Sequence, residues 1–98
     1  MKNMPLVAVA YYSREQWLRL KEIADDKKSL DKRYEDWLSG WHRFWKHSPY
    51  PKSCLIKVDV DVSELAGWCL ARNRPLDSSA RSEFVAEKIK TQDSIAPQ

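Results

Sequence analysis

The order of apolar and polar positions predicts two strands. In residues 5–12, both the odd-numbered and the even-numbered positions are apolar, which is typical of a strand that is covered on both faces. Residues 54–60 instead alternate, so that Leu55, Lys57 and Asp59 share one face and the remaining, apolar side chains share the other. The second strand is therefore expected to bury only one of its faces.

Four further segments carry the 3.6-residue periodicity of amphipathic helices. Two of them directly follow a predicted strand, and each opens with a capping box: Ser13 with Gln16, and Asp61 with Glu64. The last helix is expected to begin at Asp77 or Ser78. The predicted helices cover residues 13–24, 29–46, 61–72 and 77–90.

The helix predicted over residues 29–46 carries a stripe of aromatic side chains. Trp37, Trp41 and Trp45 stand one turn apart, and the large apolar side chains of this segment fall within an arc of about 120°. A stripe of this width is typical of a helix that faces a core. Its C-terminal end precedes a proline-containing loop, where a small domain offers least cover. We therefore expect Trp37 in the core, and Phe44 and Trp45 where the protein meets a partner.

The element order is β-α-α-β-α-α, which predicts one α+β domain over residues 1–90 with an aromatic-rich core. Residues 91–98 show no pattern and are predicted to form a flexible tail. Two strands alone make a marginal sheet with unpaired edges. Either the four helices cover this sheet in a monomer, or a homodimer joins strand edges into a larger sheet. The pattern leaves open whether the strands are parallel or antiparallel.

Composition narrows the class of protein. The 98 residues carry 17 basic and 14 acidic side chains, and the net charge of +3 does not by itself indicate a nucleic-acid partner. No apolar run approaches the roughly 18 residues of a membrane span, and the N-terminal segment lacks the full apolar region of a secretory signal. The two cysteines, Cys54 and Cys69, are too few for a disulfide scaffold. The sequence thus predicts a cytoplasmic protein with no membrane partner.

One stretch combines cations with aromatic rings. No Asp or Glu occurs from residue 37 to residue 58, and Arg43, Lys46 and Lys52 lie there among aromatic side chains. Such a combination can hold single-stranded nucleic acid through phosphate contacts and base stacking. The helical spacing, however, places Arg43 and Lys46 opposite the tryptophan stripe, so only the loop brings a cation beside Tyr50. The candidate interaction surface is therefore Phe44, Trp45, Tyr50 and Lys52.

A second group of cations flanks the start of the last helix. Arg74 and Arg81 lie on either side of residues 77–80, where free N–H groups could bind a small anion or a carboxylate. Asp77 would compete with such an anion as the helix cap, and Arg81 would then pair with Asp77 or Glu83. The candidate contacts for an anion or nucleic acid are Arg43, Lys46, Arg74 and Arg81.

The sequence contains no convincing catalytic or metal site. Asp59 and Asp61 form a D-x-D pair, but Asp61 is already expected to cap a helix. Cys69 could act as a nucleophile with His42, although its place on an inner helix face predicts burial. His42 and His47 have the wrong spacing for a shared metal on a helix. The chain also lacks a glycine-rich phosphate loop, so no metal or cofactor is expected.

Residues spread over most of the chain resemble a known group of proteins. The pattern combines Tyr12, Gln16, Trp17 and Leu20 with Tyr34, Glu35 and Trp37, and then Trp68-Cys69 with residues 75–81. It resembles a group of short uncharacterised bacterial proteins and covers most of residues 11–90. The resemblance implies a compact bacterial cytosolic domain that stands alone, and it implies no catalytic residue.

The expected function is that of a small cytosolic interaction protein without enzymatic activity. A homodimer would form through the strand edges or through residues 44–52. Two alternatives remain: a nucleic-acid-associated accessory protein that uses residues 37–58, and a small-molecule enzyme that uses Cys69 or Asp59 and Asp61. The first of these alternatives is less favoured than the interaction protein, and the second is the weakest.

Overall fold

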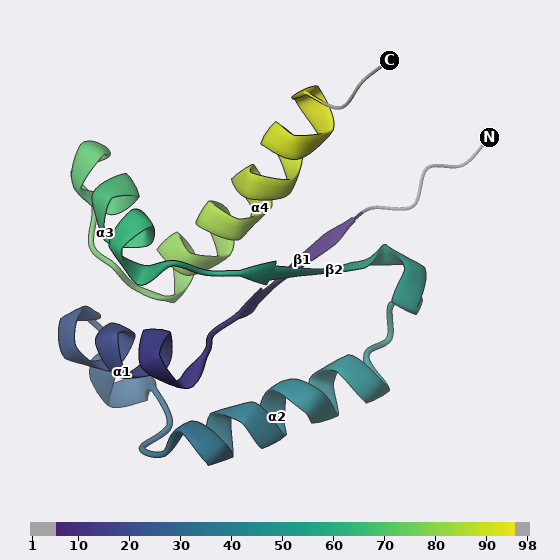
Figure 1. Cartoon of the computed structure of the whole chain (residues 1–98), viewed down its shortest axis with the longest axis horizontal. Coiled ribbons are helices and arrows are strands. Elements are labelled where there is room, and N and C mark those ends of the chain that lie inside the picture. The colour runs from purple at the N-terminus through teal and green to yellow at the C-terminus, as the bar shows by residue number, and fades with distance from the viewer. Residues whose placement is uncertain (1–5, 96–98) are drawn as a thin grey trace.

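The computed structural model describes the backbone of residues 6–95 and the side chains up to Lys90, and it forms a two-stranded sheet with four α-helices (Figure 1). The elements are β1 (Val7–Tyr11), α1 (Arg14–Ile23), α2 (Tyr34–His47), β2 (Leu55–Asp59), α3 (Val62–Ala71) and α4 (Ser78–Ile95). Two short 3-10 turns, η1 (Lys27–Ser29) and η2 (Lys52–Cys54), flank α2. The order confirms the predicted α+β class and β-α-α-β-α-α arrangement. In the described backbone, no helix has the length and apolar content that crossing a membrane requires.

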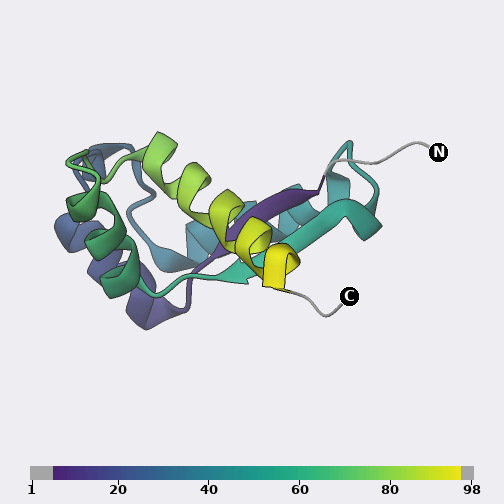
Figure 2. The ribbon, with the colours of Figure 1, turned by 90° about the horizontal axis from the view of Figure 1, so that it is seen from above.

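The two strands run parallel, which settles the direction that the sequence left open. Val7 lies opposite Leu55, and Tyr11 lies opposite Asp59. A parallel pair needs a long crossover, and α1 and α2 supply it. Figures 1 and 2 show α4 on one side of the strands and α2 on the other. The small sheet thus lies between two helices, although Lys57 and Asp59 of β2 remain exposed.

The core gathers where the strands lead into their helices. The largest fully buried side chains in the described structure are Trp17 and Leu20 of α1 and Val62 and Leu65 of α3. From α4, Ala80, Phe84 and Val85 add buried surface, in agreement with the amphipathic periodicity of this segment. An aromatic-rich core is confirmed, because Tyr12, Trp17 and Tyr34 belong to the same cluster and Trp37 packs against it.

The predicted capping residues start both helices that follow a strand. Ser13 Oγ accepts from the Gln16 N–H at 3.3 Å, and Asp61 Oδ1 accepts from the Glu64 N–H at 3.2 Å. The Gln16 side chain does not complete its own capping box. It reaches across to α3 and accepts from the Val62 N–H at 2.6 Å. One side chain therefore links the two strand-to-helix junctions.

Several element boundaries differ from the prediction. The helix expected over residues 29–46 begins only at Tyr34, and Leu30 enters the core from an extended segment after η1. Ile23 is exposed although its helical spacing from Leu20 predicts the inner side of α1, and Leu55 is buried although it shares a face with charged residues. The last helix continues to Ile95 and so takes in part of the predicted tail. Residues 96–98 of that tail lie outside the described residues.

Candidate interaction surface

The outer edge of β2 is the unpaired edge of the sheet. The Tyr11 carbonyl accepts from the Val60 N–H at 3.0 Å across the sheet. By the alternation of a strand, the backbone groups of Lys57 and Asp59 then point away from β1. Within the described residues no third strand lies beside β2, and no hydrogen bond engages the backbone groups of Lys57 and Asp59 on this edge. An edge of this kind is a template for adding another strand.

The outer edge of β1 is covered by two aromatic side chains of α2. Here the same alternation turns the carbonyls of Ala10 and Tyr12 away from β2. The Trp41 indole Nε1 donates to the Ala10 carbonyl at 2.9 Å, and the Tyr34 hydroxyl donates to the Tyr12 carbonyl at 2.8 Å. A new strand would have to displace α2 to pair here. Of the two strand edges considered for a dimer, the structure therefore leaves only that of β2 open.

A row of ring contacts connects the edge of β2 to the end of α2. Lys57 Nζ lies 4.4 Å from the centre of the Tyr11 ring, and that centre lies 5.0 Å from the centre of the Trp41 ring. Trp41 and Trp45 stack, with their ring centres 5.0 Å apart and their planes 15° apart. Tyr11 could not be identified as a member of this row from the sequence, because periodicity within α2 carries no information about a ring on β1.

The four predicted interaction residues lie at the end of α2 and in the loop that follows. Phe44 and Tyr50 are 42% and 45% exposed, whereas Trp45 is half-buried against Trp41. Lys52 Nζ donates to the Lys46 carbonyl at 3.2 Å, so this ammonium satisfies the C-terminal end of α2. The end of the stripe is thus its more exposed part, as expected.

Trp37, which was predicted to lie in the core, is only half-buried, as are Trp41 and Trp45. Its ring stacks on the buried Trp17 ring, with centres 5.1 Å apart and planes 24° apart. It also packs against the core cluster beside Tyr12. The tryptophan stripe therefore packs against the core at Trp37, whereas at its other end Trp45 stacks on Trp41.

The four predicted anion contacts do not form one site. Arg43 and Lys46 are exposed on α2, while Arg74 and Arg81 flank the turn between α3 and α4. Arg74 Nη1 lies 2.8 Å from Glu83 Oε1, and this guanidinium holds the pKa of the Glu83 carboxyl below its ordinary value. The charge of Arg74 is thus already balanced within the protein.

Arg81 pairs with a residue that the sequence did not suggest. Its Nη1 and Nη2 each lie 2.8 Å from an oxygen of Asp26, and this contact lowers the pKa of the Asp26 carboxyl. The Asp25 N–H donates to the Leu76 carbonyl, and the Asp25 carboxylate accepts from the Leu76 N–H, which brings the two loops together. The predicted pairing of Arg81 with Asp77 or Glu83 is wrong. Asp77 caps α4 instead, since its Oδ1 accepts from the Ala80 N–H at 3.0 Å.

The residues considered for catalysis are buried, cap a helix, lie on a strand edge or contact an aromatic ring, and they do not form a catalytic site in the described structure. Cys69 is 4% exposed, and burial raises the pKa of its thiol, which disfavours the reactive thiolate. Asp61 caps α3, and Asp59 lies exposed on the edge of β2. The His42 ring lies edge-on against Trp41, with centres 5.3 Å apart. In the described part of the chain, no three His, Cys, Asp or Glu side chains gather as a metal site would require.

A cavity of about 250 Å³ lies at the carboxyl end of β1, between α1, α2 and α4. Tyr12 and Trp17 line it together with Arg81, and the serines at positions 78 and 82 add hydroxyl groups. Tyr12 Oη and Trp17 Nε1 are sealed from solvent and have no hydrogen-bond partner in the described structure. Burial raises the pKa of Tyr12 to about 12. Such unpaired buried donors are uncommon in proteins, and a local helical pattern gives no sign of them.

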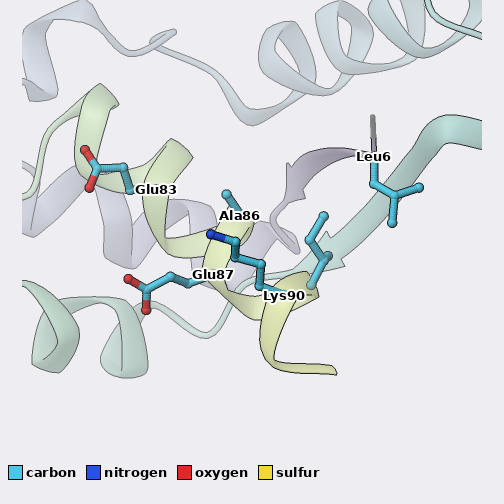
Figure 3. A pocket seen from close by; sticks show the side chains of 6 residues that line it. Leu6, Glu83, Ala86, Glu87 and Lys90 are labelled. Atoms are coloured by element: carbon cyan, nitrogen blue, oxygen red, sulfur yellow. The ribbon is translucent and has the colours of Figure 1, made fainter. Parts of the chain in front are cut away.

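A larger hollow of about 490 Å³ opens beside α4 (Figure 3). Its labelled side chains are Glu83, Ala86, Glu87 and Lys90 from α4, and Leu6 from the chain before β1. Glu87 Oε1 accepts from Arg72 at 3.3 Å and from the Trp68 indole at 3.2 Å. Because Glu83 is also bound, by Arg74, both acids of this hollow are engaged within the protein. Its lining therefore offers less for recognition than the edge of β2.

Comparison with known proteins identifies no relative of this chain. No family model, no curated protein and no solved structure matches this chain. The resemblance to short bacterial proteins therefore stays a prediction, and a functional proposal has to rest on the surface described above.

Proposed function

We propose that this protein is a small non-enzymatic interaction domain that binds an extended polypeptide strand along the outer edge of β2. The observation that carries this proposal is the difference between the two edges of the sheet. Side chains of α2 already bind the outward-facing carbonyls of Ala10 and Tyr12, whereas the outward-facing backbone groups of Lys57 and Asp59 are unpaired in the described structure. In strand addition, main-chain hydrogen bonds supply affinity and alternate side chains supply specificity.

The surroundings of this edge favour a strand of mixed character. On one face, Lys57 and Asp59 are exposed, and the ring row begins at Tyr11. On the other face, Ile56 and Val58 are half-exposed. A bound strand would therefore place charged or aromatic side chains on the first face and apolar side chains on the second. This alternation is the pattern of β2 itself.

The alternatives receive less support. Nucleic-acid binding loses two of its four candidate cations, because Arg74 and Arg81 are paired with carboxylates. An enzyme based on Cys69 would need a thiolate where burial disfavours one. The thiols of Cys54 and Cys69 are free and buried, which supports our proposal of a reducing, cytoplasmic location.

Substitution of Lys57 by proline tests the edge directly. The Lys57 N–H points outward, so Lys57→Pro removes a donor from the outer edge and leaves the ladder between β1 and β2 intact. Lys57→Ala is the matched control, because it removes the same side chain and keeps the N–H. Short random peptides would be selected for binding to the wild-type protein. We expect Lys57→Pro to abolish their binding and Lys57→Ala to retain it.

Amide hydrogen exchange locates the bound peptides. Binding along the edge should slow exchange of the Lys57 and Asp59 amides, which point outward in the free protein. Peptides that bind Lys57→Pro as tightly as wild type, and that leave both amides unprotected, would show that the edge is not the binding surface. A titration with single-stranded oligonucleotide at about 50 mM salt tests the nucleic-acid alternative, because electrostatic binding is strongest at low salt.

A further inference from the structure

We infer that the strand bound at the edge of β2 is β2 of a second copy of this chain, paired antiparallel about a two-fold axis at Val58. This inference rests on the proposed strand addition and identifies its partner. A two-fold interface uses the same patch on both subunits, so the patch must complement itself. The edge of β2 meets this condition in one register.

The backbone limits the registers that are possible. Residues 55, 57 and 59 point outward, and in an antiparallel pair an outward-facing residue must lie opposite another outward-facing residue. An axis at Lys57 or at Asp59 therefore places that residue opposite its own copy, with like charges in contact. An axis at Ile56 leaves Asp59 facing the turn before the partner's β2. Only an axis at Val58 places Lys57 opposite the partner's Asp59.

The charges favour that register. Opposite charges directly across an antiparallel pair are stabilising, and like charges are destabilising. By symmetry, the axis at Val58 creates two such favourable pairs. Both charges are available, since Lys57 and Asp59 are exposed and neither takes part in any of the salt bridges found among the described residues.

The apolar face agrees with the same register. Val58 would meet the partner's Val58 in a pair without hydrogen bonds, the geometry in which opposite side chains approach most closely. Ile56 would meet the partner's Val60. Ile56 and Val58 are half-exposed in a single copy, so pairing would cover them. The result is a four-stranded sheet with the order β1-β2-β2-β1, which has no open β2 edge and is no longer a marginal pair of strands.

Charge reversal at the two positions tests the register. Lys57→Glu and Asp59→Lys each turn both favourable pairs into repulsive ones. We expect each single variant to dimerise about tenfold more weakly than wild type or worse, as measured by sedimentation equilibrium at low salt. An equimolar mixture of the two variants should dimerise again, because every cross-strand pair between them is of opposite charge. The double variant should also regain the dimer.

Matched controls change the same charges elsewhere. Lys28 and Asp31 are exposed, in η1 and in the loop after it. The substitutions Lys28→Glu and Asp31→Lys should therefore leave the strength of dimerisation unchanged. Circular dichroism and thermal melting would verify folding, which exposed substitutions should preserve. Rescue in the mixture is the decisive result, because damage to either fold alone would not be repaired by mixing.

The outcomes separate this inference from the proposed function. If the wild-type chain stays monomeric at all concentrations, the inference that a second copy binds the edge is refuted. The proposal of strand addition is still supported in that case if selected peptides protect the Lys57 and Asp59 amides. A dimer that Asp59→Lys does not weaken has another register or surface, and it also overturns the inference. If neither a dimer nor a peptide protects those amides, the proposed function fails as well.

Discussion

Replacing Tyr12 by phenylalanine should stabilise the protein. Tyr12 is 4% exposed, and its hydroxyl has no hydrogen-bond partner in the described structure, so folding removes this group from water without compensation. An unpaired buried donor costs about 1–3 kcal/mol. The phenylalanine ring would keep its contacts with Trp17 and Trp37, whose ring centres lie 6.1 Å and 5.5 Å away. We expect the free energy of unfolding to rise by about 1 kcal/mol at pH 7.

Urea unfolding measures this change, and thermal melting should show a rise of roughly 4–8 °C for a domain of this size. Tyr34→Phe is the matched control with the opposite sign. The Tyr34 hydroxyl donates to the Tyr12 carbonyl at 2.8 Å, so its loss should lower the free energy of unfolding by about 1 kcal/mol. If Tyr12→Phe instead destabilises the protein by a similar amount, the hydroxyl has a partner, such as a water in the adjoining cavity, and the reasoning is refuted.

The same variant should change the response to alkaline pH. Burial raises the pKa of Tyr12 from 10.0 to about 12 in the native state. The contribution of this group to stability is therefore complete below pH 10 and is lost as the pH rises to about 12, because only the unfolded chain ionises in that interval. Two pKa units correspond to about 2–3 kcal/mol. Wild type should lose this amount relative to Tyr12→Phe over the interval, and parallel curves would contradict the assignment.

Two further substitutions test contacts that join distant parts of the chain. Asp26→Asn should lower the free energy of unfolding by about 2 kcal/mol at pH 7, because it breaks the two-point ion pair with Arg81. The pKa of Asp26 is lowered in the native state, so this stability is present above pH 3.8 and is lost on acidification. If urea titrations give the same difference in free energy of unfolding between wild type and Asp26→Asn at pH 3 and at pH 7, the pairing is contradicted. Trp41→Phe should cost about 1 kcal/mol, since the Ala10 carbonyl loses its donor, and unchanged urea unfolding would show that α2 does not protect this edge.

Much of the local structure could be predicted from the sequence. The element order and the capping residues Ser13 and Asp61 could be predicted, and the cap of the last helix could be narrowed to Asp77 or Ser78, because a cap and its helix lie within a few residues of one another. The inner faces of α3 and α4 followed from periodicity for the same reason. The start of α2 was not readable. Leu30 fits the helical stripe by spacing, but it reaches the core from an extended segment, and only its tertiary neighbours distinguish the two possibilities.

The candidate surface could be predicted only in part. The alternation of residues 54–60 placed Lys57 and Asp59 on one face, and at the end of the aromatic stripe Phe44 is exposed as expected, whereas Trp45 is half-buried. The sequence could not show which strand edge is open. That depends on the parallel pairing of β1 with β2 and on two side chains of α2 that bind carbonyls on the far side of β1.

The sequence by itself determined the strands, the helices and most of their buried faces, because periodicity and capping act between residues that are close along the chain. Only the tertiary structure decided which groups are left without partners. The open edge of β2, the pairing of Arg81 with Asp26 and the unpaired hydroxyl of Tyr12 all depend on contacts between segments far apart in sequence. Hydrogen bonds and ion pairs act over a few ångströms in space, and no local pattern records which distant residue will come within that range.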